Sequence, residues 1–335
     1  MTDVQWENLS NWSIAAAGIV YFLALLAHLV EWASLRKLPA SVAVDSGATS
    51  TSQATGAVAV ATGPPEEPVE RVVQRTAFLG RLGYLLTCVA VVVHLVGLVG
   101  RGMAADPNRV PWGNMYEFTI SGVWVVAFLY VVLYRRFKLA WMAPIVVAFV
   151  VSVLMVAVIW LYSPVAPLTE ALDSYWLVIH VVSAIIATGA FTLGGITSAL
   201  YLVKSRSVRK GSTKAGYVAR LPQPDVLDRV SYRLHAFAFP VWTFAVLITG
   251  PIWAHEAWAS YWSWDPKEVW AFITWVIYAA YLHARTTAGW KGRNAAILAL
   301  VGMATLWFNF IGINYFSTTS QHSYAGETPA RIADR

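Results

Sequence analysis

Long apolar runs constrain this chain more than any other feature of its sequence. Eight segments of about the length that crosses a bilayer occur at 13–33, 78–100, 116–134, 140–161, 174–203, 233–253, 269–286 and 295–316. Hydrophobic residues make up 58% of the chain and charged residues only 13%, more apolar surface than one water-soluble core can bury. Backbone amides in hydrocarbon must pair within their own segment, and no alternation suggests a barrel. The sequence therefore predicts an all-α, polytopic integral membrane protein with about eight transmembrane helices.

The distribution of positive charge predicts which helix ends face the cytoplasm, because Lys and Arg are retained there. One assignment places 19 of the 24 Lys and Arg residues in four cytoplasmic loops, and the opposite assignment would carry most of them across the membrane. Both termini are then external, as are the loop after Tyr162 and the segment after Trp253. The basic loops can face anionic lipid headgroups, so the net charge of +6 requires no nucleic-acid partner. We expect a multi-pass protein of the plasma (cytoplasmic) membrane.

Composition also predicts the domain organisation. Residues 1–35 are expected to form the first transmembrane helix, 36–75 a flexible cytoplasmic linker rich in Ala, Ser, Thr, Gly and Pro, 76–316 a seven-helix core, and 317–335 an external tail. The single cysteine, Cys88, excludes an internal disulfide, a CxxC redox centre and a cysteine zinc site in this chain.

Six tryptophans gather in the segment 253–275, WAHEAWASYWSWDPKEVWAFITW. An aromatic belt at the membrane surface is one explanation, because Trp is enriched at bilayer interfaces. Ordinary anchoring needs far fewer rings. The spacing of Trp258, Trp262 and Trp264 before Asp265 favours instead a flat surface that holds a large planar ligand by one edge, and haem is the candidate that we expect.

The DPKE turn at 265–268 has a structural interpretation of its own. Proline suits the first position of a helix, Glu268 complements the helix dipole, and Asp265 can cap exposed amides. Lys267 could in addition balance a haem propionate, as could Arg101 or Arg109, because a carboxylate at a dry site needs a cation. The WGNMYE run at 112–117 is expected on the same side, either as a helix start or as part of the site.

Two of the seven histidines reach the external face from segments that flank the tryptophans. His180 lies near the external end of its helix, and His322 lies in the tail. Each alone would be an ordinary interfacial or solvent histidine. Together they have the arrangement needed for two axial ligands that approach one iron from opposite sides.

His283 is expected much deeper, about 22 Å from the external surface at 1.5 Å per helical residue. Ionisable side chains at such depth usually face a partner or a cavity, so a second haem site near the inner leaflet is one hypothesis, and a histidine bonded to a neighbouring carbonyl is the other. His28 lies at similar depth. His94, His235 and His255 are given structural roles.

These segments resemble the haem-handling family of cytochrome c maturation, System II, and within it the CcsA/ResC branch, called CcsB in actinobacteria. The most specific match is the WWD segment from Trp258 to Trp270, which separates this branch from CcmC and CcmF. The other matches are PWGNMYEF at 111–118, SYWLVIH ending at His180, YLHAR around His283, GIN at 312–314 and HSY at 322–324. His255 and Ala259 stand where the family often has Asn and Gly.

The resemblance implies a site for haem b and an activity as a cytochrome c haem lyase. His180 and His322 would be external axial ligands, and His283 would belong to a membrane-embedded haem site whose opposite ligand comes from a ResB/Ccs-type partner. The remaining residues implied at the external site are Trp253, Trp258, Trp262, Trp264, Asp265, Lys267 and Trp270. The implied chemistry adds the thiols of an apocytochrome c CxxCH sequence to the two haem vinyl groups. A thiol-reducing protein would be a further partner.

Two other functions fit the same residues. A haem exporter without ligation activity would share every one of them. A quinone-linked cytochrome b would carry electrons, but such proteins usually pair histidines inside the bundle, whereas the best pair here lies on external segments.

Overall fold

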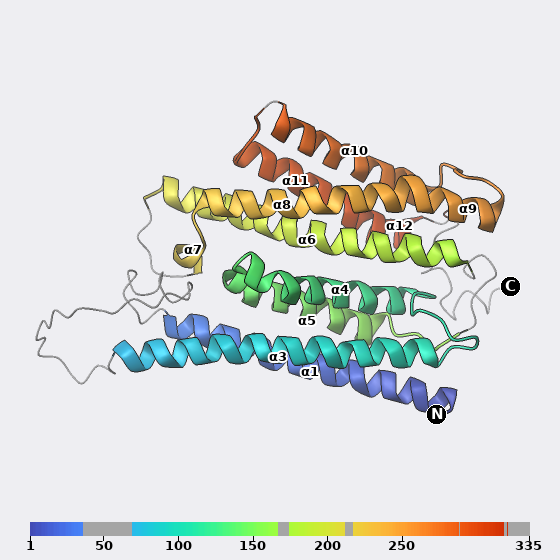
Figure 1. Ribbon diagram of the computed structural model, residues 1–335, viewed down its shortest axis with the longest axis horizontal. Coiled ribbons are helices and arrows are strands. Elements are labelled where there is room, and N and C mark those ends of the chain that lie inside the picture. The colour runs from blue at the N-terminus through green and yellow to red at the C-terminus, as the bar shows by residue number, and fades with distance from the viewer. Residues whose placement is uncertain (36–68, 167–173, 212–216, 288, 318–319, 321–335) are drawn as a thin grey trace, which may run out of the picture.

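Every element in the described part of the chain is helical (Figure 1). A computed structural model describes residues 1–35, 69–166, 174–211, 217–287, 289–317 and 320. The elements are α1 (Asp3–Leu35), α3 (Val69–Met103), α4 (Met115–Arg136), η1 (Leu139–Met142), α5 (Ala143–Trp160), α6 (Tyr175–Arg209), α7 (Tyr217–Arg220), α8 (Pro224–Thr243), η3 (Phe244–Thr249), α9 (Gly250–Trp258), α10 (Pro266–Thr286), α11 (Arg293–Trp307), η4 (Phe308–Gly312) and α12 (Ile313–Phe316). The predicted all-α class is confirmed.

Seven helical segments in the described residues are long and apolar enough to cross a membrane. One of them joins α8, η3 and α9 into a continuous 35-residue helix, Pro224–Trp258. The remaining predicted span, 269–286, coincides with helix α10, which has 21 residues and is not among the seven. The protein is therefore a multi-pass membrane protein, and the count of eight spans stays a prediction.

Several helices extend beyond the apolar runs that predicted them. Helix α3 begins at Val69, within the 36–75 segment predicted as a linker, most of which lies outside the described residues. Helix α6 continues to Arg209, and α8 begins at Pro224, where proline occupies the first turn. Polar residues at the ends of these helices continue the backbone hydrogen bonding beyond the apolar part, so hydropathy alone understates their length.

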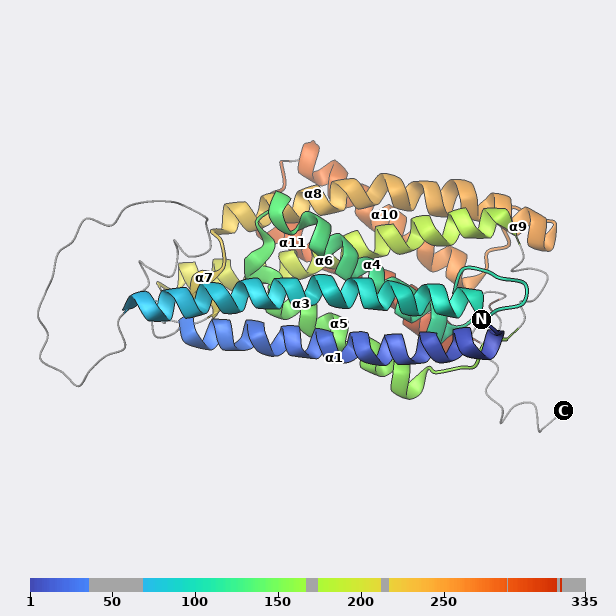
Figure 2. The same ribbon diagram turned by 60° about the horizontal axis from the view of Figure 1, so that its bottom comes forward.

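The helices run side by side and form two groups (Figures 1 and 2). Helices α1, α3, α4 and α5 pack together, as do α6, α8, α10 and α11, and the contact of α6 with α4 joins the groups. The N-terminus, α9 and the end of α12 lie at one end of the bundle, here called the tryptophan end. The opposite end holds α7 and the turn between α10 and α11. This arrangement is the one that the predicted topology requires.

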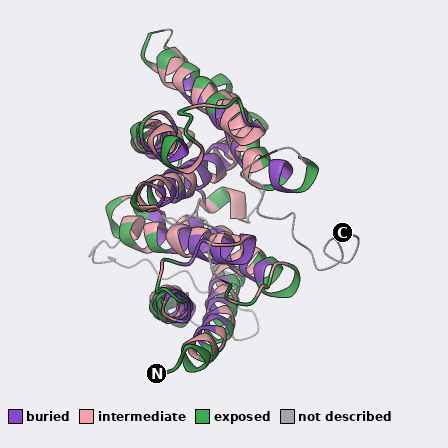
Figure 3. Cartoon of the chain, turned by 90° about the vertical axis from the view of Figure 1, so that its right-hand side faces the viewer, coloured by how far each residue is buried: buried purple, intermediate pink, exposed green. Residues whose placement is uncertain are grey.

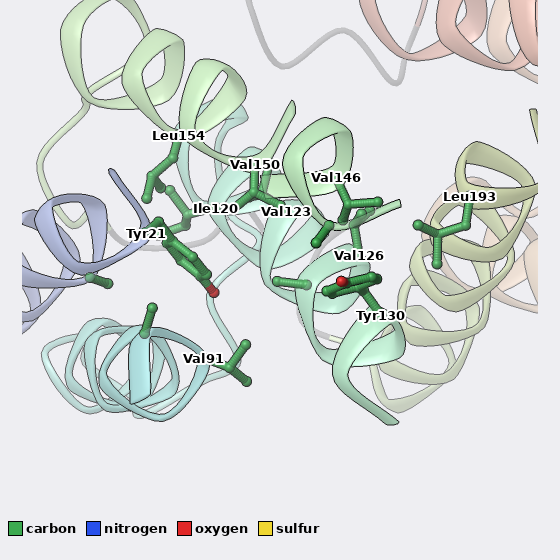
Figure 4. Close-up of a cluster of buried hydrophobic side chains, with 14 of the residues drawn as sticks. Tyr21, Val91, Ile120, Val123, Val126, Tyr130, Val146, Val150, Leu154 and Leu193 are labelled. Carbon is green, nitrogen blue, oxygen red and sulfur yellow. The ribbon is translucent and has the colours of Figure 1, made fainter. Parts of the chain in front are cut away.

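The largest hydrophobic core fills the first group and its contact with α6. Figure 4 shows Tyr21, Val91, Ile120 and Val150 turned toward one another from four helices. A second core joins α6, α8 and α10, where the rings of Phe191 and Tyr278 stack 3.7 Å apart. Viewed along the helices, buried residues face the interior and exposed ones face outward (Figure 3), as expected where lipid covers the outer faces.

Candidate functional site

A cavity opens between the second helix group and α4, toward the tryptophan end. It holds about 970 Å³ of space not occupied by atoms, including the part open to solvent. Its lining residues come from α4, α6, α8, η3, α9, the loop before α10, α10, α11 and η4. They are mainly apolar or aromatic. The polar members are His180, Thr188, Lys267, Glu268 and Asn309, together with the indole N–H of Trp262 and the hydroxyl of Tyr261.

His180 lies in this cavity, two turns into α6. Ser174 caps the helix by accepting a hydrogen bond from the Trp176 amide, so the helix starts where the sequence predicts. The His180 ring places Nδ1 2.9 Å from the Ala245 carbonyl oxygen of η3. Trp253 lies nearly parallel to the imidazole, with an interplanar angle of 16° and ring centroids 5.9 Å apart. The histidine is thus held on one side by backbone and on another by an indole.

The tryptophans differ in their contributions. Trp253 is buried and lines the cavity, as does Trp262. Trp258 supports Trp253 from outside the lining, with centroids 4.8 Å apart. Trp264 is 72% exposed and touches the edge of Trp262. Trp270 packs against Phe308 of η4. The structure therefore brings two of the five predicted tryptophans to the cavity surface and three to its surroundings.

The loop between α9 and α10 turns through residues with left-handed backbone. Ala259 has φ +55° and Trp264 has φ +59°. Ala259 follows the last residue of α9, a position where helices often place glycine because a Cβ is unfavourable there. The glycine of the related pattern would adopt this left-handed backbone without strain, whereas the Cβ of Ala259 makes it less favourable.

Asp265 and Glu268 form a capping box at the start of α10. The Asp265 side chain accepts from the Lys267 amide, and Glu268 accepts from the amides of Asp265 and Ser263. The Ser320 hydroxyl also donates to Asp265, over 2.8 Å, which brings the chain two residues before His322 to this loop. His322 itself lies outside the described residues.

Lys267 is the cation of the cavity lining. Burial lowers the pKa of its ammonium group to about 7, and the nearby Asp265 carboxylate opposes part of that shift. Because burial disfavours the charged form of the ammonium group, a carboxylate bound beside it would favour that form.

Arg101 and Arg109, the other predicted partners for a carboxylate, are bound to Glu117. The Arg101 Nε lies 3.0 Å from Glu117 Oε1, and the Arg109 Nη1 lies 2.6 Å from Oε2. Neither arginine lines the cavity. The 112–117 run thus builds a helix start and an ion-pair cluster, with Asn114 capping α4.

None of the other described histidines lines the cavity. His283 is exposed on α10 near the opposite end of the bundle, with Thr287 Oγ1 3.5 Å from its Nδ1. His28 is buried and bonded to Glu31, His94 is buried beside Tyr21, and His235 is buried against Ser231 and Tyr281. His255 stacks on Tyr261 at the loop surface. None of these contacts joins two histidines.

Sequence reasoning missed the contribution of η4. Asn309 and Phe310 of this π-helical turn line the cavity. The Asn309 Oδ1 and the Trp262 Nε1 are buried atoms without a hydrogen-bond partner among the described residues. Buried polar atoms are normally paired, so both indicate a site for a polar group of a ligand. The sequence signal for this contribution was the Asn309 side chain inside the apolar run LWFNFIG at 306–312. Hydrophobic periodicity does not distinguish such an asparagine from a residue that only packs.

Comparison with known proteins gives consistent similarities. The model of the family described as cytochrome C assembly protein matches residues 112–320. The chain is 34% identical over 260 residues to the cytochrome c biogenesis protein CcsA of Guillardia theta, covering 72% of this chain and 85% of that protein. It is 37% identical over 231 residues to CcsA of Chlamydomonas reinhardtii, covering 65% of this chain and 61% of that protein.

Among solved structures, the fold is similar to that of the cytochrome c haem lyase CcmF. The TM-score is 0.57 over 92% of this chain and 47% of that one. At 13% identity, this likeness concerns the fold. The region shared with this chain spans only part of some CcsA proteins. It covers 61% of the Chlamydomonas protein and 60% of the CcsA of Synechococcus elongatus.

Proposed function

Because this chain belongs to the cytochrome c assembly protein family and is similar to its CcsA members, we propose that its cavity holds haem b and presents it for attachment to apocytochrome c. The family membership supports a role in cytochrome c maturation. The observation that carries the finer proposal is the position of His180, which lies beside Trp253 in a cavity that Lys267 also lines.

The residues present fit a haem. Apolar and aromatic side chains form most of the cavity surface, as a porphyrin face requires. His180 offers an imidazole for iron, and Lys267 offers a cation for a propionate. Trp262 Nε1, which has no hydrogen-bond partner in the part of the chain that the structure describes, would supply a further donor. His322 is proposed as the second ligand, and the hydrogen bond from Ser320 to Asp265 supports this because Ser320 precedes His322 by two residues and lies beside the loop.

The proposed reaction needs no side-chain nucleophile. Each cysteine thiol of a CxxCH sequence adds S–H across one vinyl C=C bond, which forms a thioether and leaves no other product. His180 would ligate the iron, Trp253 and Trp262 would border the porphyrin, and Lys267 would pair with a propionate. Haem held in this way would present its vinyl edge to the incoming thiols, and positioning of this kind supplies much of the rate in such sites.

We further propose that a ResB/Ccs-type membrane partner and a thiol-reducing protein act with this chain. His283 is exposed in the last turn of α10, so its ring is accessible to a partner helix that packs against this face. A partner helix that covers this face could supply the opposite ligand of an inner haem. The external location of the outer cavity and the plasma-membrane location follow from the predicted topology.

Reconstitution tests the activity. The protein, its membrane partner, haem, a reductant and a CxxCH peptide are combined in vesicles, and thioether formation is followed by the pyridine haemochrome spectrum and peptide mass. We expect covalent haem peptide with the wild type and little with His180→Ala. Haem that crosses the vesicle membrane without any thioether would favour the exporter, and reversible haem reduction with quinone turnover would favour a cytochrome b.

A further inference from the structure

The π-helical turn η3 lies directly opposite His180. It interrupts the long helix between α8 and α9 and contributes Val246 to the cavity lining. The second π-helical turn among the described elements, η4, lines the same cavity through Asn309. Single π-helical turns add a residue to a helix and frequently occur at functional sites. The two turns therefore mark the walls of one cavity.

The carbonyl of Ala245 is the contact between η3 and His180. It accepts the Gly250 amide in the i to i+5 pattern of a π-helix, and it also lies 3.1 Å from Thr249 Oγ1 and 2.9 Å from His180 Nδ1. A carbonyl oxygen can only accept, so the imidazole nitrogen that faces it carries the proton. In the neutral ring the lone pair then resides on Nε2.

Gly250 packs directly against the imidazole of His180. A Cβ at this position would lie 3.1 Å from both Cε1 and Nδ1 of His180 and 3.1 Å from the Ala245 oxygen. These separations are tighter than ordinary van der Waals contact, and the oxygen belongs to rigid backbone. Trp253, three residues further on, lies parallel to the same ring. Glycine is the residue that allows the imidazole to rest against this backbone.

We propose that η3 and Gly250 form a backbone seat that fixes His180 in the Nδ1-protonated tautomer and in one ring plane, so that Nε2 is the nitrogen presented to iron. Ala245, through its carbonyl, and Gly250 are positioning residues of the outer site. This inference rests on the proposed role of His180 as a haem ligand. Groups that orient a metal-binding histidine typically change metal affinity by about 10- to 100-fold when they are altered.

Gly250→Ala tests the seat, and Gly18→Ala is its matched control. Both are helical glycines, but a Cβ at Gly18 meets only Leu154 at 3.8 Å, an ordinary contact. We expect Gly250→Ala to weaken haem binding about 10- to 100-fold and to change the low-spin electron paramagnetic resonance signal, with Gly18→Ala unchanged. Wild-type affinity and signal in folded Gly250→Ala protein would overturn the proposal.

A second measurement does not depend on the folding of a variant. Nitrogen-15 resonances of the histidines in apo wild-type protein report which ring nitrogen carries the proton, and His180→Gln assigns the relevant pair. The proposal expects a protonated Nδ1 on His180, and protonation on Nε2 alone would refute it. If His180→Ala leaves haem ligation unchanged, the proposed ligand role fails separately, whatever the tautomer.

Discussion

Replacement of Glu117 is expected to destabilise the tryptophan end of the bundle. Its carboxylate is fully buried and accepts four hydrogen bonds from three residues: Arg101 Nε at 3.0 Å, Arg109 Nη1 at 2.6 Å and Nη2 at 3.3 Å, and the Gly113 amide at 2.7 Å. Glu117→Gln keeps the shape but removes the charge that compensates two arginines. Breaking a buried ion pair costs about 3–5 kcal/mol. Because Glu7 still lies 3.5 Å from Arg101, we expect the lower end, about 3 kcal/mol.

Asp225→Asn is the matched control. Asp225 pairs with Arg229 at 2.8 Å, but both side chains are more than 60% exposed, at 66% and 63%. Exposed pairs contribute at most about 1 kcal/mol. The free energy of unfolding of each variant is measured by titration with sodium dodecyl sulfate in mixed micelles. If Glu117→Gln and Asp225→Asn lowered the free energy of unfolding by the same small amount, the buried ion-pair cluster would not stabilise the tryptophan end.

Glu117 also affects the cavity indirectly. The Glu117 carboxylate accepts a hydrogen bond from the amide of Gly113, next to Trp112. Trp112 packs in one cluster with Trp253 and Leu177. Loss of the carboxylate therefore loosens a segment that supports the indole beside His180. We expect weaker haem binding in Glu117→Gln as a secondary effect, smaller than that of His180→Ala.

Two further predictions concern Lys267 in the first turn of α10 and Ala259 in the loop before it. The pKa of Lys267, about 7, means that its charge is lost as pH rises through neutrality, so haem affinity measured by titration should fall between about pH 6 and 8. In Lys267→Met this pH dependence should disappear, and its persistence would exclude a propionate at Lys267. Ala259→Gly removes a Cβ from a position with left-handed backbone, which relieves steric strain there. We expect it to stabilise the protein by up to about 1 kcal/mol, measured as a raised melting temperature. The control Ala280→Gly, on an exposed face inside α10, should instead lower it, and a lowered value for Ala259→Gly would contradict the argument.

The long helices could be predicted because membrane burial imposes a strong pattern on the sequence. Apolar runs located the seven segments that are long and apolar enough to cross a membrane, and the predicted cap Asp265 marked the start of α10. Helix ends were less well predicted, since polar residues continue α3 and α6 beyond the apolar part. The N-terminus, α9 and the end of α12 lie at one end of the bundle, as the sequence predicts.

The site was predictable only in part. Trp253 could be singled out because six tryptophans within 253–275 are more than interfacial anchoring needs, and His180 because its helix end lies on the same predicted face. The π-helical turns could not, because they depend on how α8 and α11 pack rather than on any local residue pattern. For the same reason, the sequence did not predict that Asn309 lines the cavity. Arg101, one of the cations considered for a haem propionate, instead forms an ion pair with Glu117.

The measurement that tests the account most directly is ligation of haem by the purified protein. Absorption and electron paramagnetic resonance spectra are recorded for the wild type, His180→Ala and His322→Ala, with free imidazole added to each variant. The account predicts a low-spin bis-histidine haem in the wild type, its loss in each variant, and its recovery with imidazole. Unchanged bis-histidine spectra in His180→Ala would show that the cavity beside Trp253 does not hold the iron.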